Sequence, residues 1–274
     1  MNTLYHYCSI DSFFNILRTK NIRLTDTLGM NDSREGRWAD LIINPLISNE
    51  ELFSSVEQGR EFLNAYHLSK PSPFIFCFSE HPDILSQWRA YSNDGTGVCI
   101  GFSSNFFPPS NPFAPTNAAP KKNTRLEQVL YVPEDTHLIK ELLKKFKIWE
   151  ESQEVPPPTP HGFLGMYAAS LSAVIKNPAF YEEKEWRLIH SPILMRDDQN
   201  RHRPIGTDLN IEQYVSGNKI RTYFEYPIAK DGTHAISEIW LGPKCELTLY
   251  ELSLFFSLNN YGDIPVKRSK ATYR

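Results

Sequence analysis

The chain has 274 residues, of which 41% are hydrophobic and 22% are charged, and its formal net charge is −3. This composition excludes a disordered chain, and the length allows one large domain or two small ones. The small negative charge excludes a general attraction to nucleic acid or to an acidic membrane surface.

The first half of the chain predicts strands that are separated by amphipathic helices. The predicted elements are a strand at 4–7, a helix at 12–19, a strand at 22–25, a polar turn at 31–36, a helix at 38–45, a helix at 48–66, a strand at 74–78, a helix at 79–91 and a strand at 98–102. Ser48 and Glu51 form a capping-box pattern for the longest helix. The strands at 74–78 and 98–102 are almost wholly apolar, which indicates burial on both faces.

The second half begins with a segment rich in Pro, Asn and Ser, which predicts a long exposed loop. The predicted elements are this loop at 103–125, a strand at 129–132, a helix at 135–151, a buried helix at 163–175, a strand at 177–189, an irregular polar segment at 190–217, strands at 220–226 and 236–241, a helix at 247–258 and a strand at 264–266. Strands and helices do not alternate strictly, and no clear linker occurs. We therefore expect a single mixed α+β domain over residues 1–274, with 103–125 and 191–217 as long loops or insertions.

The cysteines give no sign of a metal or redox site. They are Cys8, Cys77, Cys99 and Cys245, and none lies in a C-x-x-C pair or at ligand spacing from a histidine. We therefore predict no metal. No segment resembles a signal peptide, and no apolar run approaches membrane-spanning length, so we expect a cytoplasmic protein without a membrane partner. The sequence does not indicate the oligomeric state.

The predicted strand at 177–189 carries the most informative polar pattern. Alternation of side chains puts Trp186 and Leu188 on a core face, and Glu183, Glu185 and Arg187 on a second face. A Glu-x-Glu pair beside an arginine suits a site in which a cation fixes a carboxylate. The same pattern is also that of a solvated strand face, which is its commoner meaning.

Common catalytic and cofactor motifs do not occur in this sequence. There is no P-loop, G-x-G-x-x-G, G-x-S-x-G or H-E-x-x-H. His6 lies in the first strand between two tyrosines, where an imidazole can bond a ligand hydroxyl or belong to a core network. Trp88 and Tyr91 lie three residues apart on a predicted helix, so we expect them to share a face. That face is either core or a wall that stacks against a flat, cationic ring.

Several stretches together resemble the bacterial family catalogued as domain of unknown function 2971. They are 4–9, 24–32 with Glu35, 77–80, 88–91 running into 97–102, 181–189 and 239–243. The resemblance spans residue 4 to about residue 243. Ser33 stands where the family has a proline, and the segment 103–125 is outside the family pattern. The family name carries no activity.

The order of these features is also similar, more distantly, to the ADP-ribosyltransferase plan. This second resemblance implies a central, largely antiparallel split sheet with peripheral helices. It implies that NAD is the substrate and that the protein is an ADP-ribosyltransferase or an NAD glycohydrolase, in the role of a toxin or phage-defence effector. The acceptor would be nucleic acid, a protein side chain, a small molecule or water.

The ADP-ribosyltransferase resemblance also implies roles for particular residues. The residues that would bind NAD are His6, Tyr7, Trp88, Tyr91 and Arg187, and the catalytic residue would be Glu185. His6 would bond the ribose, and Tyr91 or Trp88 would stack on the nicotinamide. Glu185 would stabilise an oxocarbenium-like state and orient or deprotonate the acceptor. Arg187 would hold the glutamate or meet a phosphate.

Two other classes of function are compatible with the same residues. The first is a non-enzymatic nucleotide-sensing or protein-interaction domain, which would bind a nucleotide without turning it over. The second is a metal-dependent nuclease that uses Asp32, Glu35, Glu183 and Glu185 as oxygen ligands. These carboxylates are far apart in the sequence, and no compact acidic motif supports the nuclease.

Overall fold

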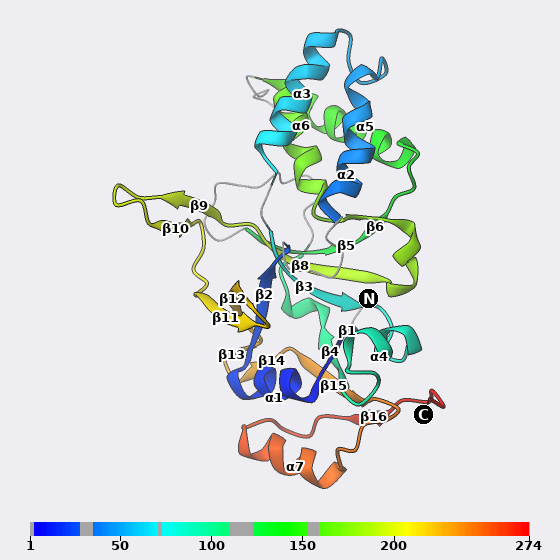
Figure 1. Ribbon diagram of the computed structural model, residues 1–274, viewed down its shortest axis with the longest axis vertical. Helices are drawn as coiled ribbons and strands as arrows, with labels where there is room; N and C mark the ends of the chain where they lie inside the picture. Colours follow the sequence, from blue (N-terminus) through cyan, green and yellow to red (C-terminus); the bar gives the residue numbers. More distant parts are fainter. Residues whose placement is uncertain (1–2, 28–34, 71–72, 110–122, 153–158, 274) are drawn as a thin grey trace.

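A large sheet runs through the middle of the molecule (Figure 1). The computed structural model describes residues 3–27, 35–70, 73–109, 123–152 and 159–273. The strands of the sheet are β1 Thr3–Cys8, β2 Asn21–Asp26, β3 Phe74–Ser79, β4 Val98–Ser103, β5 Thr124–Gln128, β8 Glu185–His190, β11 Ile211–Ser216, β12 Lys219–Pro227, β15 Ile236–Leu241 and β16 Val266–Arg268. Their order is β11-β12-β2-β3-β1-β4-β15-β16, and β8 and β5 extend the sheet from β3. Neighbouring strands in this sheet are antiparallel except β15 and β16.

The sheet divides at β3. β8 pairs with β3 along its whole length, from Phe74↔His190 to Ser79↔Glu185. β2 pairs with β3 only at Phe74 and Ile75, and β1 pairs with β3 only at Ser79. Between these points β1 and β2 diverge, and helix α1 (Ile10–Thr19) connects them. The predicted mixed α+β fold is therefore confirmed, with a sheet that is largely antiparallel and split.

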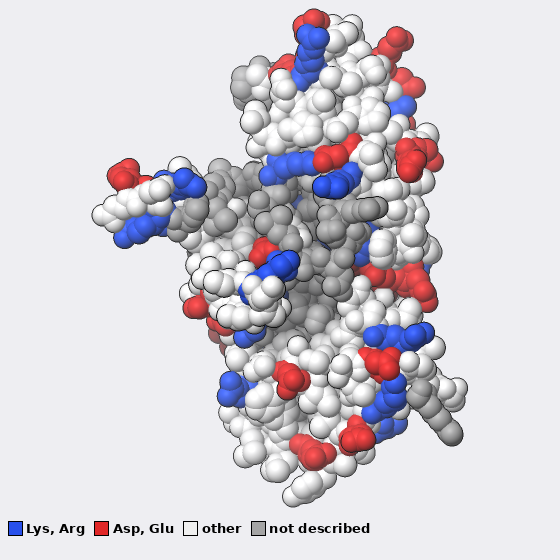
Figure 2. Space-filling view, in the orientation of Figure 1, with Lys and Arg blue, Asp and Glu red and all other residues white. Residues whose placement is uncertain are grey.

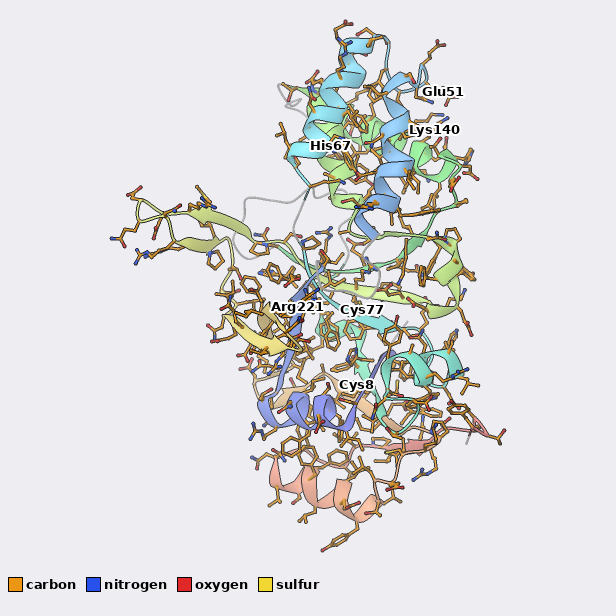
Figure 3. All side chains as sticks on the ribbon, in the orientation of Figure 1. Cys8, Glu51, His67, Cys77, Lys140 and Arg221 are labelled. Carbon is orange, nitrogen blue, oxygen red and sulfur yellow. The ribbon has the colours of Figure 1, made fainter. Side chains whose placement is uncertain are left out.

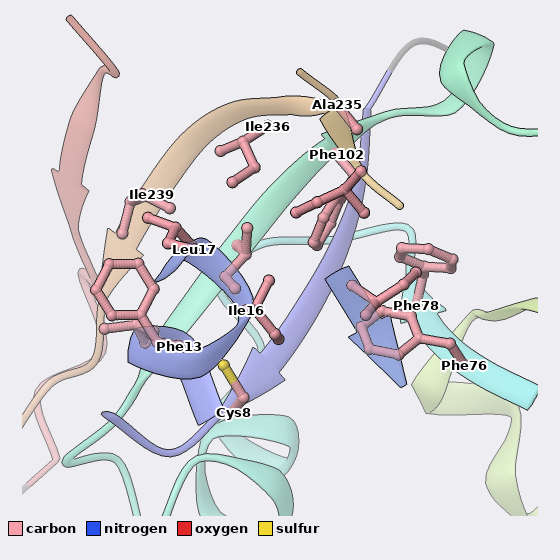
Figure 4. Close-up of a cluster of buried hydrophobic side chains, with 14 of the residues drawn as sticks. Cys8, Phe13, Ile16, Leu17, Phe76, Phe78, Phe102, Ala235, Ile236 and Ile239 are labelled. Atoms are coloured by element: carbon pink, nitrogen blue, oxygen red, sulfur yellow. The ribbon is translucent and has the colours of Figure 1, made fainter. Parts of the chain in front are cut away.

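One apolar core lies between the sheet and the two helices α1 and α7 (Leu249–Leu258). Ser9 caps α1 by accepting a hydrogen bond from the backbone N–H of Ser12. Phe13, Ile16 and Leu17 recur at helical spacing and point into the sheet (Figure 4). Burial of this face explains why the helix forms where the sequence predicts it.

A second core lies under the helices at the other end of the molecule (Figure 1). These helices, called the helical cap below, are α2 Glu35–Ile43, α3 Val56–Leu68, α5 His137–Glu151 and α6 Pro160–Leu171. Gly165 allows α3 and α6 to approach closely, because a Cβ at this position would lie 2.2 Å from the carbonyl oxygen of Phe62. Ile75 and Ile189 connect the cap core to the sheet.

Several predicted helix boundaries are wrong, and one of them is the start of the helix predicted at 79–91, which begins at Leu85. The helix predicted at 48–66 begins at Val56, where Ser55 accepts a hydrogen bond from the backbone N–H of Gln58. Residues 44–48 instead form a 3-10 turn that contains Pro45 near its start. The helix predicted at 163–175 ends at Leu171, and the chain continues into the short strand β7 (Ile175–Lys176), which pairs with β6 (Leu130–Tyr131).

The strand predicted at 177–189 is correct only in its second half. Residues Pro178–Glu183 form a 3-10 helix that Asn177 caps. Lys184 then adopts a left-handed conformation with φ 46°, and β8 starts at Glu185. Proline and the left-handed residue both interrupt an extended chain.

The predicted loops contain more regular structure than expected. The segment 191–217 holds the hairpin of β9 (Ile193–Arg196) and β10 (His202–Ile205), and it also holds β11. Ser103 closes β4 and Thr124 opens β5, so the ends of the predicted loop 103–125 are strands. Residues 110–122, and residues 31–34 of the predicted polar turn, lie outside the described residues. The remaining short elements are η2 Asn44–Ser48, α4 Leu85–Tyr91, η3 Ser104–Phe106, η4 Pro178–Glu183, β13 Ala229–Lys230 and β14 Thr233–His234.

Candidate functional site

The divergence of β1 and β2 leaves a cleft beside β3. Its larger part, a pocket of about 390 Å³, is lined by α1 and β2. A smaller pocket of about 90 Å³ continues from it toward Glu183 and Glu185. Both pockets share His6, Cys77 and Tyr91 in their walls. Figure 3 places Cys77 near the middle of the molecule, between the helical cap and the α1 end.

Glu185 lies at the inner end of the smaller pocket and is 4% exposed. Arg187 donates from Nε to Oε1 at 2.8 Å and from Nη2 to Oε2 at 3.0 Å. Lys176 donates from Nζ to Oε2 at 2.8 Å. The backbone N–H of Glu185 donates to the hydroxyl of Tyr131. The carboxylate is thus fixed on both oxygens by two cations.

The two cations decide the ionisation of Glu185. Burial by itself raises the pKa of this carboxyl, but the charge and hydrogen bonds of Arg187 and the charge of Lys176 outweigh it and lower the pKa to about 2. In the same way, burial lowers the pKa of Lys176, but Glu185 and Glu183 outweigh it and raise the pKa. Glu185 and Lys176 are therefore both charged at neutral pH, and Glu185 is a weak proton acceptor.

Glu183 occupies the same cluster although it is not in the strand. Lys176 Nζ donates to Glu183 Oε2 at 2.6 Å, and the hydroxyl of Tyr91 donates to Oε1 at 2.9 Å. Lys176 therefore bridges the two carboxylates of the predicted Glu-x-Glu pair. The prediction that Glu185 and Arg187 share a strand face is correct. The interpretation of that face as a solvated one is wrong, because both side chains are buried.

His6 closes the base of the split. Its Nδ1 lies 2.8 Å from the carbonyl oxygen of Cys77, and its ring stacks on Phe76 at 4.0 Å. A carbonyl only accepts hydrogen bonds, so Nδ1 is the protonated nitrogen. Burial lowers the pKa of His6 to about 4, and the ring is neutral near pH 7. Nε2 is then a hydrogen-bond acceptor on a residue that lines both pockets.

The two predicted aromatic residues of the middle segment have different surroundings. Tyr91 is 40% exposed and lines both pockets. Trp88 is fully buried, donates from Nε1 to Asp83, and packs edge-to-face on Tyr7 at 4.8 Å. The two rings therefore do not form one stacking wall, because Trp88 belongs to the core and Tyr91 reaches the pockets. Of the two aromatics, only Tyr91 lines this cleft.

Tyr7 and Arg187 support the cleft. The hydroxyl of Tyr7 donates to the carbonyl of His81 and accepts from the N–H of Ile84, which holds the segment that leads into α4. Arg187 also donates from Nη1 to the carbonyl of Ala173. Of the two predicted roles of Arg187, the geometry matches the one in which it holds the glutamate.

Sequence reasoning missed Lys176 and Cys77 as site residues. Lys176 follows a predicted helix and lies on a strand of only two residues, so no periodicity marks it. Cys77 lies in an apolar run that predicts a buried position, but it is half-buried and lowers the pKa of Glu185 through a side-chain hydrogen bond. A lysine close before a Glu-x-Glu segment is the one available signal.

The described residues give no metal cluster. No group of three or more His, Cys, Asp or Glu among them is placed to hold an ion. Of the predicted nuclease ligands, Asp32 lies outside the described residues, and Glu183 and Glu185 are bonded to Lys176. In the same described part, no helix has the length and apolar character that crossing a membrane requires.

The face shown in Figure 2 carries basic and acidic side chains interspersed. On the β9–β10 hairpin, Arg201 and Arg203 both pair with Asp197. This mixture agrees with the small net charge of −3.

A family model matches part of the chain. Residues 87–188 match the model of a family described as "Protein of unknown function (DUF2971)". The match supports the predicted family over this segment, which runs from α4 to Leu188 and includes Tyr91, Lys176, Glu183 and Glu185. No curated protein and no solved structure matches the chain.

Proposed function

We propose that the protein consumes NAD, as an ADP-ribosyltransferase or an NAD glycohydrolase. One observation supports this proposal above the others. The split of the sheet brings His6 of β1, Tyr91 of α4 and the Glu183–Glu185 pair into the walls of one pocket. These are the residue types that bind a ribose, stack on a cationic ring and stabilise positive charge.

His6 and Tyr91 would bind the nicotinamide riboside half of NAD. The neutral His6 offers an unprotonated Nε2 to a ribose hydroxyl, because its Nδ1 proton is used by Cys77. The Tyr91 ring is exposed to the pocket, and its hydroxyl bond to Glu183 fixes its orientation. A π face over the cationic nicotinamide contributes on the order of 1 kcal/mol or more when water is excluded.

Glu185 would act through its charge. Cleavage of the nicotinamide–ribose bond develops positive charge on the ribose, which a fixed carboxylate stabilises. Its pKa of about 2 makes Glu185 a poor base near pH 7, so the predicted deprotonation of the acceptor does not fit this residue. The second carboxylate, Glu183, is the candidate for orienting an acceptor or a water molecule.

The acceptor and the biological role remain predictions. Nucleic acid, a protein side chain, a small molecule and water are all acceptor classes that a cleft open to α1 and β2 would admit. The role as a toxin or phage-defence effector follows from the resemblance to ADP-ribosyltransferases alone.

The test is nicotinamide release from NAD by the purified protein, with and without added DNA, RNA and cell lysate. We expect release by the wild type, loss of release in Glu185→Gln, and a loss of about tenfold or more in Tyr91→Leu. Glu212→Gln, at an exposed position on β11, is the matched control. Thermal melting establishes that each variant is folded. Turnover by a folded Glu185→Gln protein would remove Glu185 from the site.

A second candidate function is nucleotide binding without turnover. It is favoured by the saturated bonding of Glu185, since both oxygens already accept hydrogen bonds from cations. In that case NAD would raise the melting temperature of the protein, and no nicotinamide would be released under any condition.

A further inference from the structure

We infer that the larger pocket, between α1 and β2, binds the adenosine half of NAD. This inference rests on the proposed function for the identity of the ligand. It extends the site away from Glu185 to residues that neither the resemblance nor the family match assigns. It is carried by the polar groups on the pocket walls and by the volume of the pocket.

Two asparagines present hydrogen-bond acceptors on the pocket wall. The amide nitrogen of Asn15 donates to the carbonyl of Asp11, and that of Asn21 donates to the carbonyl of Thr19. Carbonyl oxygens only accept, so these contacts fix which end of each amide is nitrogen. Each amide oxygen is then directed away from its carbonyl partner, and neither oxygen has a hydrogen-bond donor among the residues that the structure describes. Asn15 and Asn21 therefore each offer a side-chain carbonyl oxygen as an acceptor for a ligand amine.

An acid and a cation lie on the adjoining strands. Glu225 of β12 is the register partner of Arg23 on β2, and both line the pocket. The guanidinium carbon of Arg23 lies 4.7 Å from the ring centroid of Tyr223 and 5.5 Å from that of Tyr214. The tyrosines hold the guanidinium, which can stack on a flat base or meet a phosphate.

The volume and the connection to the small pocket fit an elongated ligand. The larger pocket has about 390 Å³, within the range of roughly 300–1,000 Å³ that is usual for small-molecule sites. The smaller pocket has about 90 Å³ and admits only a small group. His6, Cys77 and Tyr91 border both, so a ligand can extend from one into the other.

These walls discriminate between purines. Adenine carries an exocyclic amine, whose two N–H groups can donate hydrogen bonds to acceptors among the Asn15, Asn21 and Glu225 oxygens. Hypoxanthine carries a carbonyl at that position, which would face acceptors and leave them unpaired. A site that is built to bond an N–H rejects an analogue that lacks it, so we expect AMP to bind at least tenfold more tightly than IMP.

The experiment is isothermal titration calorimetry of the full chain with AMP and with IMP. We expect Arg23→Ala to weaken AMP binding about tenfold, and Asn21→Leu to reduce the preference for AMP over IMP. Arg203→Ala, on the exposed β9–β10 hairpin, is the control for loss of an arginine and should bind AMP as the wild type does.

Each outcome separates this inference from the proposed function. AMP binding that depends on Arg23, in a protein that releases no nicotinamide, would retain the adenosine pocket and overturn the NAD-consuming activity. Nicotinamide release by a protein that binds AMP and IMP equally, or that binds AMP unchanged after Arg23→Ala, would overturn the pocket assignment and retain the activity. Circular dichroism and melting curves establish the folding of Arg23→Ala, and the AMP-to-IMP ratio of the wild type tests the assignment without any variant.

Discussion

Two regions that meet at β8 are both buried, but they are stabilised differently. On one side, Leu188 packs into the core under α1, which also contains Phe76, Phe78 and Phe102. On the other side, Glu185 and Arg187 form an ionic cluster with Lys176. Apolar contacts are non-directional and fail in proportion to the volume removed. The ionic groups depend on one another, because the loss of one leaves its partner buried and unpaired.

The ionic cluster holds its side chains in one arrangement, and this arrangement lowers the stability of the protein compared with an apolar core. Well-packed apolar side chains in place of a buried ion pair are often neutral or stabilising. A cluster of four charged side chains beside a cleft therefore lowers the stability of the fold; these are Lys176, Glu183, Glu185 and Arg187. Such departures from an apolar core are expected at functional sites.

Phe102→Ala should cause the largest loss of unfolding free energy, because it leaves a cavity in the apolar core. Phe102 is fully buried, and its ring lies 5.6 Å from that of Phe78 and 6.1 Å from that of Phe76. Removing a buried phenyl costs about 4–5 kcal/mol of unfolding free energy. Urea denaturation measures it. A loss below about 2 kcal/mol would mean that the core closes over the gap.

Arg187→Met removes one cation from the ionic cluster and should lower the unfolding free energy by about 3–4 kcal/mol. The carboxylate of Glu185 keeps Lys176 but loses the guanidinium, and the carbonyl of Ala173 loses its donor. The double variant Glu185→Leu with Arg187→Met should be less destabilised than Arg187→Met alone, since no carboxylate is left without its arginine. Strict additivity of the two changes, measured by urea denaturation, would contradict a mutually dependent cluster.

Acid should weaken the ionic side as the pH falls from 4.5 toward 2. The pKa of Glu185 is lowered from 4.5 to about 2, so its contribution is fully present above pH 4.5 and is lost as the pH falls toward 2. The shift corresponds to about 3 kcal/mol. Unfolding free energies at a series of pH values should therefore fall less steeply below pH 4.5 in Glu185→Gln than in the wild type.

The histidines provide the internal control for this titration. Burial lowers the pKa of His6 and of His190 from 6.5 to about 4. Both favour the folded state above pH 6.5, and this contribution is lost as the pH falls from 6.5 to 4. The wild type and Glu185→Gln should share that loss. Parallel curves at every pH would show that Glu185 is not the group that titrates below pH 4.5.

The sequence predicted the parts of the fold that local chemistry decides. The apolar runs at 74–78 and 98–102 are central strands, and the first helix covers the predicted residues 12–19. The β9–β10 hairpin was missed because Met195, Arg203 and Ile205 are exposed on a projecting arm, where burial imposes no alternation on them. Short pairings such as β6–β7 depend on tertiary contacts that no local pattern records.

The candidate site was predicted in its residue types but not in its geometry. His6, Tyr91 and Glu185 line one pocket, and this follows from the divergence of β1 and β2, which is a property of strand pairing. A strand pattern cannot show that Glu185 is buried, because an E-x-R segment has the same sequence on a solvent-exposed face and on a buried face. Lys176 pairs with the buried carboxylate of Glu185. Its role could not be predicted, because no local sequence pattern marks it as a partner of Glu185.

Thr248→Ala should have the smallest effect on the unfolding free energy, because the hydrogen bonds that it removes are exposed to water. It tests whether burial is what makes the Glu185 cluster sensitive. Thr248 and Glu251 form a capping box at the start of α7, with each side chain accepting from the other's backbone N–H. Loss of this cap should cost about 1 kcal/mol, well below the cost of Arg187→Met, because water replaces the lost partners. Ser253→Ala, exposed in the middle of the same helix, should leave the unfolding free energy unchanged or slightly raised. If Thr248→Ala costs as much as Arg187→Met in urea denaturation, burial is not what makes the Glu185 cluster sensitive to the loss of one member.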